Sequence, residues 1–239
     1  MFRAAATLAL VLCLAPQAHA QSFASLFTRL PADFGHLFEP TTGLIVGASG
    51  AAAAAVHPKD DAIATRLHAT GDGWEEMFDG GSPIGNGATQ GAAALGIYVV
   101  GRAAHAPELA SLGADLVRGQ IVGGILADGI KLAVPRARPT GSKYSFPSGH
   151  TEAAFVTATV LERHYGWKAG VPAYALAAYV GASRLAEYQH FTSDVLFGAG
   201  IGMAAGRATT FERAHQTISI VPQVTHTSVA AVVTIDRHD

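Results

Sequence analysis

The 239-residue chain has one cysteine, Cys13, and few charged residues. A single cysteine excludes a disulfide within the chain and any zinc site built from several thiolates. Charged residues make up 14% of the chain, with 16 Lys and Arg against 18 Asp and Glu. A balance this close to neutral supplies no basic patch for nucleic acid.

Long apolar runs are also missing. The uncharged segments Ala169–Ser183 and Val195–Gly206 fall short of the roughly 20 apolar residues that a spanning helix needs. The helix expected before Lys131 is interrupted by Asp115, Arg118 and Asp128. The pattern therefore argues against an integral protein with six spanning helices.

The first twenty residues have the layout of a secretory signal peptide. Arg3 provides a positive start, Ala4–Leu14 an apolar run, and Ala18-His19-Ala20 a cleavage site of small residues. We predict a signal peptide at 1–20 and an exported, periplasmic chain that begins at Gln21. A short N-terminal membrane anchor is the alternative.

Apolar residues at helical spacing, separated by Gly and Pro, predict an all-α fold. We expect a compact helical bundle with the active site between helix ends. The expected helices include 42–56, 91–104, 107–134, 151–164, 172–183 and 190–208, with a loop at 79–83. Residues 21–86 are predicted to be an N-terminal helical segment of one domain, 87–210 its core, and 211–239 a tail. A period of two in that tail favours a short C-terminal β-hairpin.

Three motifs in the second half of the chain carry residues suited to phosphate chemistry. They read K-L-A-V-P-R-A-R-P from Lys131 to Pro139, S-F-P-S-G-H from Ser145 to His150, and S-R-L-A-E-Y-Q-H-F-T-S-D from Ser183 to Asp194. A lone Lys or Arg is more often a solvated surface charge, so the joint spacing carries the signal. In these positions the chain resembles the type-2 phosphatidic acid phosphatases, whose superfamily also contains bacterial class A acid phosphatases and vanadium haloperoxidases.

The resemblance implies a metal-independent phosphatase that works through a phosphohistidine intermediate. It implies that His190 is the nucleophile, that Asp194 orients its ring, and that His150 is the general acid and base. The residues expected to bind phosphate are Lys131, Arg138, Ser148, Gly149 and Arg184, with the backbone amides of Ser148 and Gly149. Cations and free N–H groups at a helix N-terminus suit this task, because phosphoryl transfer spreads negative charge over three oxygens.

We expect neither a metal nor another cofactor. The chain has no His-x-x-x-His pair, no Asp-x-Asp pair and no cysteine ligand that would supply three or four converging ligands. The resemblance also assigns both motif histidines to a metal-free mechanism.

The motifs favour phosphorylated lipids or lipid diphosphates as substrates. S-F-P-S-G-H and the Gly-rich segment after Asp194 resemble the lipid-phosphatase branch. We therefore expect association with a membrane surface, for which Gly43–Val56 and Leu95–Val100 are the uncharged candidates. The alternatives are a periplasmic acid phosphatase for small phosphomonoesters, a vanadium haloperoxidase, and an inactive phosphate- or lipid-binding module. The inner membrane is the alternative location.

Overall fold

The computed structural model describes residues 22–214, 216–224 and 229–237. The predicted signal peptide lies outside the described residues. The helices are α1 (Ser25–Thr28), α2 (Leu30–His36), α3 (Pro40–Val56), η1 (His57–Lys59), α4 (Asp60–His68), α5 (Asp72–Phe78), α6 (Gly81–Gly85), α7 (Gly87–Ala103), α8 (Pro107–Ala133), α9 (Gly149–Tyr165), α10 (Trp167–Ala186), α11 (Thr192–Thr209) and η2 (Phe211–Ala214). The all-α class predicted from the sequence is confirmed.

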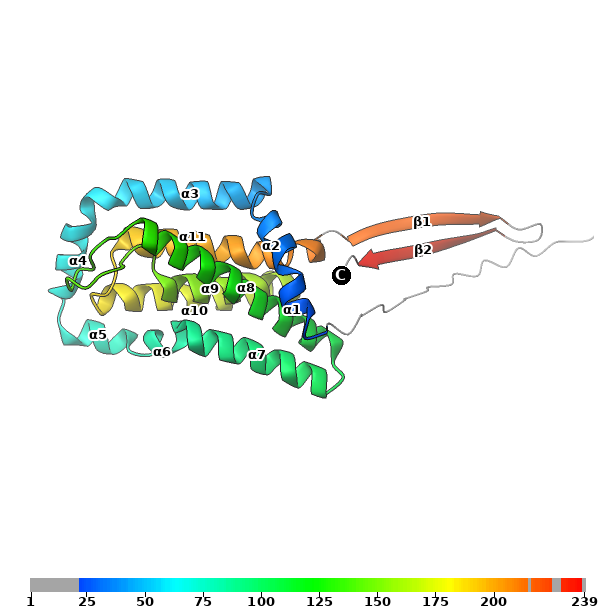
Figure 1. Ribbon diagram of the computed structural model, residues 1–239, viewed down its shortest axis with the longest axis horizontal. Helices are drawn as coiled ribbons and strands as arrows, with labels where there is room; N and C mark the ends of the chain where they lie inside the picture. Colours follow the sequence, from blue (N-terminus) through cyan, green and yellow to red (C-terminus); the bar gives the residue numbers. More distant parts are fainter. Residues whose placement is uncertain (1–21, 215, 225–228, 238–239) are drawn as a thin grey trace, which may run out of the picture. The chain divides into compact units, whose positions relative to one another are not determined.

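The long helices α3, α7, α8, α9, α10 and α11 run side by side as a bundle (Figure 1). Its core contains Leu116 and Val122 of α8, Val156 and Val160 of α9, and Ala205 of α11. The short elements η1, α4, α5 and α6 connect α3 to α7 across one end of the bundle (Figure 1). The loop between α8 and α9 lies at the same end.

Glycines on α11 let this helix approach α9 closely. A Cβ atom on Gly198 would lie 2.6 Å from the carbonyl oxygen of Ser148, and one on Gly202 would lie 2.3 Å from that of Glu152. Real Cβ atoms do not approach a carbonyl oxygen so closely. The α9–α11 contact therefore needs glycine at both positions.

Three boundaries differ from the prediction. Helix α10 begins at Trp167 rather than Pro172, so Pro172 lies inside the first two turns, where its missing N–H removes one helical hydrogen bond. Helix α11 begins at Thr192, and His190 therefore precedes it instead of belonging to it. The predicted loop at 79–83 is partly helical, because α6 begins at Gly81.

The predicted helix 107–134 is confirmed by α8, and two of its charged residues, Asp115 and Arg118, are buried. Arg118 Nη2 donates to Asp115 Oδ1 at 2.6 Å and to the carbonyl oxygen of Thr209 at 2.8 Å, while Asp115 Oδ2 lies 2.8 Å from His164 Nε2. These contacts link α8, α9 and α11, so the charges satisfy each other inside the bundle.

The C-terminal segment forms the predicted hairpin. Strand β1 (Gln216–Val224) pairs antiparallel with β2 (Val229–Arg237), with Gln216 opposite Arg237 and Val224 opposite Val229. The hairpin belongs to a separate compact unit from the helices. The domain boundaries at 20, 86 and 210 stay a prediction.

Among the described helices, α8 alone is long and apolar enough to cross a membrane, with 56% of its most apolar window buried inside the bundle. A buried core helix of a soluble protein can have the same length and composition.

Candidate active site

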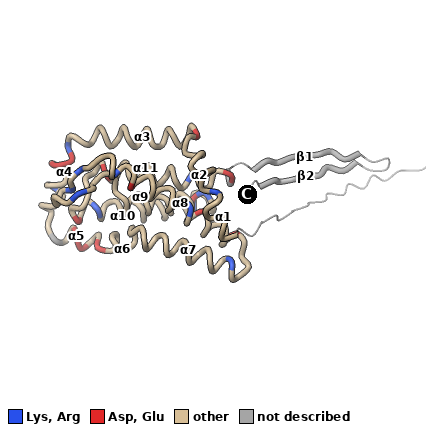
Figure 2. Tube along the Cα trace, in the orientation of Figure 1, with Lys and Arg blue, Asp and Glu red and all other residues tan. Residues whose placement is uncertain are grey.

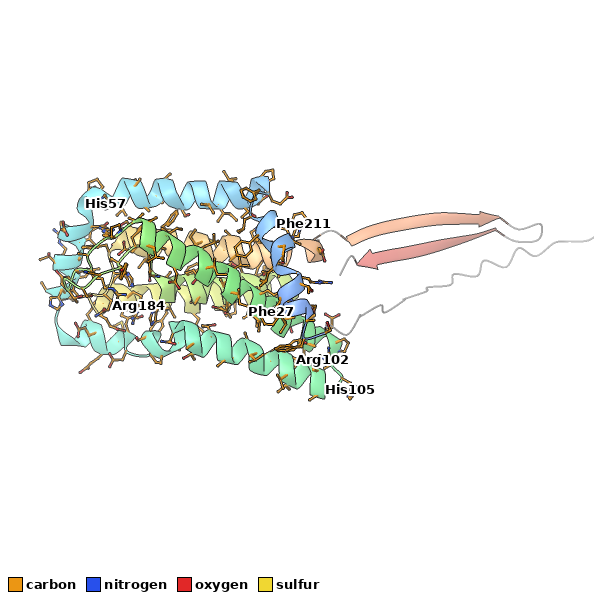
Figure 3. The ribbon with its side chains drawn as sticks, in the orientation of Figure 1. Phe27, His57, Arg102, His105, Arg184 and Phe211 are labelled. Atoms are coloured by element: carbon orange, nitrogen blue, oxygen red, sulfur yellow. The ribbon has the colours of Figure 1, made fainter. Side chains whose placement is uncertain are left out.

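All eight residues predicted for the site come from one end of the bundle. Lys131 belongs to the last turn of α8, and Arg138 to the following loop. Ser148, Gly149 and His150 stand at the start of α9, and Arg184 at the end of α10. His190 lies just before α11, and Asp194 in its first turn. Figure 3 labels Arg184 at this end, far from Arg102 and His105 at the other. The motifs meet because each lies where a helix begins or ends.

The His190 ring is buried beside Asp194. His190 is 2% exposed, and its Nδ1 lies 3.5 Å from Asp194 Oδ2, at the outer limit of a hydrogen bond. This contact leaves Nε2 as the ring nitrogen that does not face a carboxylate. Burial lowers the pKa of His190, as does the charge of Arg138, although Asp194 acts in the opposite direction. The ring is therefore neutral at neutral pH, the state in which it can act as a nucleophile.

Asp194 is an ionised carboxylate held by several donors. It accepts hydrogen bonds from the backbone N–H of Phe191 at 2.8 Å, from Arg136 Nη1 at 2.7 Å and from the Ser145 hydroxyl. Burial alone would raise the pKa of Asp194, but the hydrogen bonds and the Arg136 charge outweigh it, so the pKa is lowered. The carboxylate keeps its negative charge beside His190.

His150 is the second residue of α9 and faces a concentration of positive charge. Burial lowers the pKa of His150 to about 4. The second cause is neighbouring charge, from Arg184, His190, Arg138 and Lys131 in that order. A bound phosphate would offset these cations, so it would raise the proton affinity of His150 at the moment when an acid is needed.

Lys131 reaches the start of α9 because position 149 is glycine. A Cβ atom on Gly149 would lie 3.1 Å from Lys131 Nζ. The same ammonium group lies 3.5 Å from Asp128 Oδ1, which is largely exposed. Because Gly149 has no side chain, the Lys131 ammonium group and the N-terminus of α9 can both contact the same bound anion.

The two arginines are held by different partners. Arg138 Nη1 donates to Gln189 Oε1 at 2.9 Å, while its Nε is buried without a partner. Arg184 is 3% exposed, pairs with Glu187 and donates from Nε to Ser183 Oγ at 3.2 Å. Burial lowers the pKa of Arg184 and raises that of Glu187. Arg138 therefore has donor capacity to spare, whereas Arg184 shares its charge with a carboxylate.

Ser148 is the N-cap of α9, and one expectation about it is wrong. Its hydroxyl lies 2.9 Å from Thr151 Oγ1 and accepts from the Thr151 N–H at 3.4 Å. The Ser148 N–H donates to the carbonyl oxygen of Asp194 at 3.0 Å, so this amide does not face a ligand as expected. The amides left without a helical acceptor are those of Gly149 and His150, the first two residues of the helix.

The sequence reasoning missed two charged residues next to Asp194. Arg136 lies two residues before Arg138 and bridges Asp194 to Asp60, with 2.9 Å between Arg136 Nη2 and Asp60 Oδ2. Asp60 is the first residue of α4 and is 2% exposed. Arg136 lies within the first motif, but only Lys131 and Arg138 of that motif were assigned to phosphate binding. Nothing near Asp60 in the sequence indicates that its side chain is buried.

Glu152 is a further buried acid that the motifs do not include. It is 3% exposed, and a Cβ atom on Gly123 would lie 1.9 Å from its Oε1. Burial raises the pKa of Glu152 to about 8, against the opposing charge of Lys131. Its carboxyl group is thus mostly protonated at neutral pH, one turn below the proposed phosphate site.

In the part of the chain that the structure describes, no three His, Cys, Asp or Glu side chains converge as metal ligands. That the reaction needs no metal stays a prediction. The arrangement combines a neutral buried imidazole, a second imidazole and three cations. It can bind a tetrahedral dianion and attack its central atom.

Residues 111–211, somewhat less than half of the chain, match the model of the PAP2 superfamily.

Two known proteins are similar to part of this chain in sequence, and a third is similar in fold. A lipid A 1-phosphatase of Porphyromonas gingivalis is 39% identical over 90 residues, which are 36% of this chain and 20% of that protein. A lipid A 4'-phosphatase of Helicobacter pylori is 33% identical over 72 residues, 30% of this chain and 36% of that protein. The crystal structure of LpxE from Aquifex aeolicus is similar in fold, with a TM-score of 0.52 and 20% identity over 61% of this chain and 91% of that one.

Proposed function

We propose that the protein is a metal-independent phosphatase that hydrolyses phosphorylated lipids through a phosphohistidine at His190. The observation that carries the proposal is the meeting of His190, His150 and three basic side chains at one end of the bundle. The match to the PAP2 superfamily and the two lipid A phosphatase relatives support it.

In the first step Nε2 of His190 attacks phosphorus while Asp194 faces Nδ1 and favours the tautomer that carries its proton there. An N–P bond forms, and the bond from phosphorus to the ester oxygen breaks. His150, protonated when phosphate offsets the surrounding cations, gives its proton to the leaving oxygen. The products of this step are the free alcohol and the phosphoenzyme.

In the second step a water molecule attacks the phosphohistidine. His150 is now neutral and accepts the proton of that water, while the N–P bond breaks and inorganic phosphate is released. Lys131, Arg138 and Arg184 stabilise the charge on the equatorial oxygens in both steps, together with the N–H groups of Gly149 and His150. No redox chemistry takes part.

The distribution of charge supports a lipid substrate. In α7, α9, α10 and α11 the Lys, Arg, Asp and Glu residues lie toward the helix ends, and α3 carries none (Figure 2). The two charges near the middle of α8, Asp115 and Arg118, are buried. Large apolar side chains nevertheless face outward in the middle turns, including Leu176 of α10 at 49% exposure and Leu95 of α7 at 42%. Such a surface suits contact with acyl chains better than contact with water.

We therefore propose that the exported protein is associated with a membrane. The 17 residues of α3, all uncharged, form a helix about 25 Å long at 1.5 Å per residue. The candidate site lies at a charged end of the bundle, where polar headgroups would meet it while acyl chains remain beside the apolar zone.

The test compares kcat/KM for detergent-dispersed lipid A, phosphatidic acid and a prenyl diphosphate with that for p-nitrophenyl phosphate, in the presence of EDTA. We expect at least one lipid to be preferred by about 100-fold, because binding of its remote groups contributes to transition-state stabilisation. Preference for the soluble ester, with the protein in the periplasmic extract, would support the acid-phosphatase alternative. Loss of activity in EDTA, restored by a divalent ion, would overturn the metal-free mechanism.

A further inference from the structure

A series of buried and half-buried charged side chains leads from helix α4 to His190. Asp60 Oδ2 lies 2.9 Å from Arg136 Nη2, and Arg136 Nη1 lies 2.7 Å from Asp194 Oδ1. Asp194 in turn faces His190 at 3.5 Å. One guanidinium group therefore stands between two buried carboxylates, of which only the second touches the proposed nucleophile.

Additional contacts hold the guanidinium in one orientation. Arg136 Nη1 donates to Ser193 Oγ at 2.7 Å, and its guanidinium carbon lies 4.1 Å from the centre of the Phe191 ring. The Ser193 N–H donates to Asp60 Oδ1 at 3.1 Å, and its hydroxyl also donates to Asp60. A planar fork can reach both carboxylates at once, whereas the single amine of a lysine reaches one.

We propose that Arg136 and Asp60 are positioning residues that set the orientation and the effective charge of Asp194 for His190. The inference rests on the proposed function, because it assigns them a part in the step made by His190. Arg136 offsets the negative charge of Asp194, and Asp60 offsets that of Arg136. His190 is thereby kept neutral but directed by a carboxylate.

Other charged groups face this series and remain in every variant. Arg138 and His150 act on His190. On the other side, His57 Nδ1 lies 3.2 Å from Asp60 Oδ2, with the His57 side chain 62% exposed. Since these groups are common to the wild type and to each variant, differences between variants report the substituted residue.

The two positioning residues should shift the acid limb of the kcat/KM profile in opposite directions. His190 must be neutral to attack, so activity falls as the pH drops through its pKa. Replacing Arg136 by Met exposes His190 to the full charge of Asp194, which raises its pKa and moves the limb to higher pH. Replacing Asp60 by Asn frees the charge of Arg136, which moves the limb to lower pH. We expect shifts of about 0.5 unit or more in each direction.

The experiment measures kcat/KM from pH 4 to 8 for the wild type, Arg136→Met, Arg136→Lys, Asp60→Asn and Asp61→Asn. Asp61 is the exposed neighbour of Asp60 on the same helix, and its substitution should leave the limb unchanged because solvent screens it. Arg136→Lys should restore the limb toward wild type but only part of kcat, since its amine reaches one carboxylate. The ionisation of the substrate is the same throughout.

A second readout does not depend on activity. Histidine ¹⁵N spectra of the substrate-free protein give the pKa and tautomer of His190, identified by the signal that disappears in His190→Gln. Opposite shifts in Arg136→Met and Asp60→Asn support the proposal. Equal shifts, or reduced kcat with no shift, overturn it and leave the two residues with a structural role.

If Arg136→Met does not fold, Asp60→Asn and Arg136→Lys decide the matter, because they keep nearly the native volume. A wild type that hydrolyses none of the phosphorylated substrates would refute the proposed function. The spectra would still test whether Arg136 and Asp60 control the charge state of His190.

Discussion

The backbone N–H of Ser148 donates a hydrogen bond to the backbone carbonyl of Asp194, with 3.0 Å between nitrogen and oxygen. This bond joins the start of α9, which carries His150, to the first turn of α11, whose Asp194 faces His190. Gly198 also lies against the Ser148 carbonyl group. The two histidines of the proposed mechanism are therefore positioned by adjoining backbone, and not by loops that move independently.

This contact predicts the effect of a single methyl group. Gly198→Ala should lower the free energy of unfolding by about 2 kcal/mol, because its Cβ atom would lie 2.6 Å from the Ser148 carbonyl oxygen. Gly124→Ala is the matched control, since a Cβ atom there has nothing within 4 Å. It should raise stability by about 0.5 kcal/mol through helix propensity. Thermal unfolding of both variants in one buffer measures the difference, and equal melting temperatures would contradict the close contact.

Gly149→Ala should reduce activity with little effect on stability. The new Cβ atom would lie 3.1 Å from Lys131 Nζ, the end of a flexible side chain that can move aside. Moving the ammonium group away from phosphate should lower kcat/KM about 10-fold or more while the melting temperature stays near wild type. Steady-state kinetics and a melting curve on the same preparation separate the two effects. Unchanged kcat/KM would show that Lys131 does not act at this position.

Loss of the His190 ring should abolish turnover. We expect His190→Ala to lower kcat by about 1,000-fold or more, because no other group can form the covalent intermediate. His105→Asn is the control, at the far end of the bundle (Figure 3), and its positive φ of 52° is one that Asn tolerates. Labelled substrate quenched during turnover should leave label on the protein that resists base and is removed by acid. Label found on a serine would assign the nucleophile elsewhere.

The lowered pKa of His150 should make the protein less stable in mild acid. Its pKa is about 4 in the folded protein and 6.5 in the unfolded chain, so between these values the unfolded state binds more protons. Stability is therefore lost as the pH falls from about 6.5 to about 4. We expect a loss of about 1 to 2 kcal/mol after solvent screening, absent from His150→Gln. Denaturant titrations of both proteins across this range measure it, and parallel pH profiles would contradict the shift.

Glu152 should act in the opposite sense. Its folded pKa of about 8 lies above the ordinary 4.5, so stability is lost as the pH rises through that interval. Glu152→Gln, which resembles the protonated acid, should therefore stabilise the protein at pH 7 by about 2 kcal/mol and have little effect near pH 4. Glu76→Gln serves as the exposed control. A Glu152→Gln protein that is no more stable than wild type at pH 7 would show that the acid is ionised or hydrated.

The sequence indicated the long helices well where apolar periodicity and breaking residues agreed. Pro107 and the proline-rich segment after Val134 enclose α8, and Gly166 follows the end of α9. The predicted helix boundaries were wrong where tertiary packing outweighed a local sequence preference. Pro172 can lie within α10 because one lost hydrogen bond near a helix start is offset by burial of the following residues.

For the candidate site, too, the sequence predicted some features and left others to the tertiary structure. The motif spacing identified residue types suited to phosphate, since charge and nucleophilicity belong to the side chains themselves. It did not reveal that Glu187 pairs with Arg184, that the Ser148 amide is occupied, or that Glu152 is buried.

The amino-acid sequence alone determined the helical class, the three motifs and the chemistry open to their side chains, because these depend on local composition and spacing. Only the tertiary structure decided which charges are buried and what each one faces. Asp60 meets Arg136 across 76 residues and Ser193 across 133. Burial and pairing set the pKa of a group, and both arise from contacts between distant segments, which spacing along the chain does not encode.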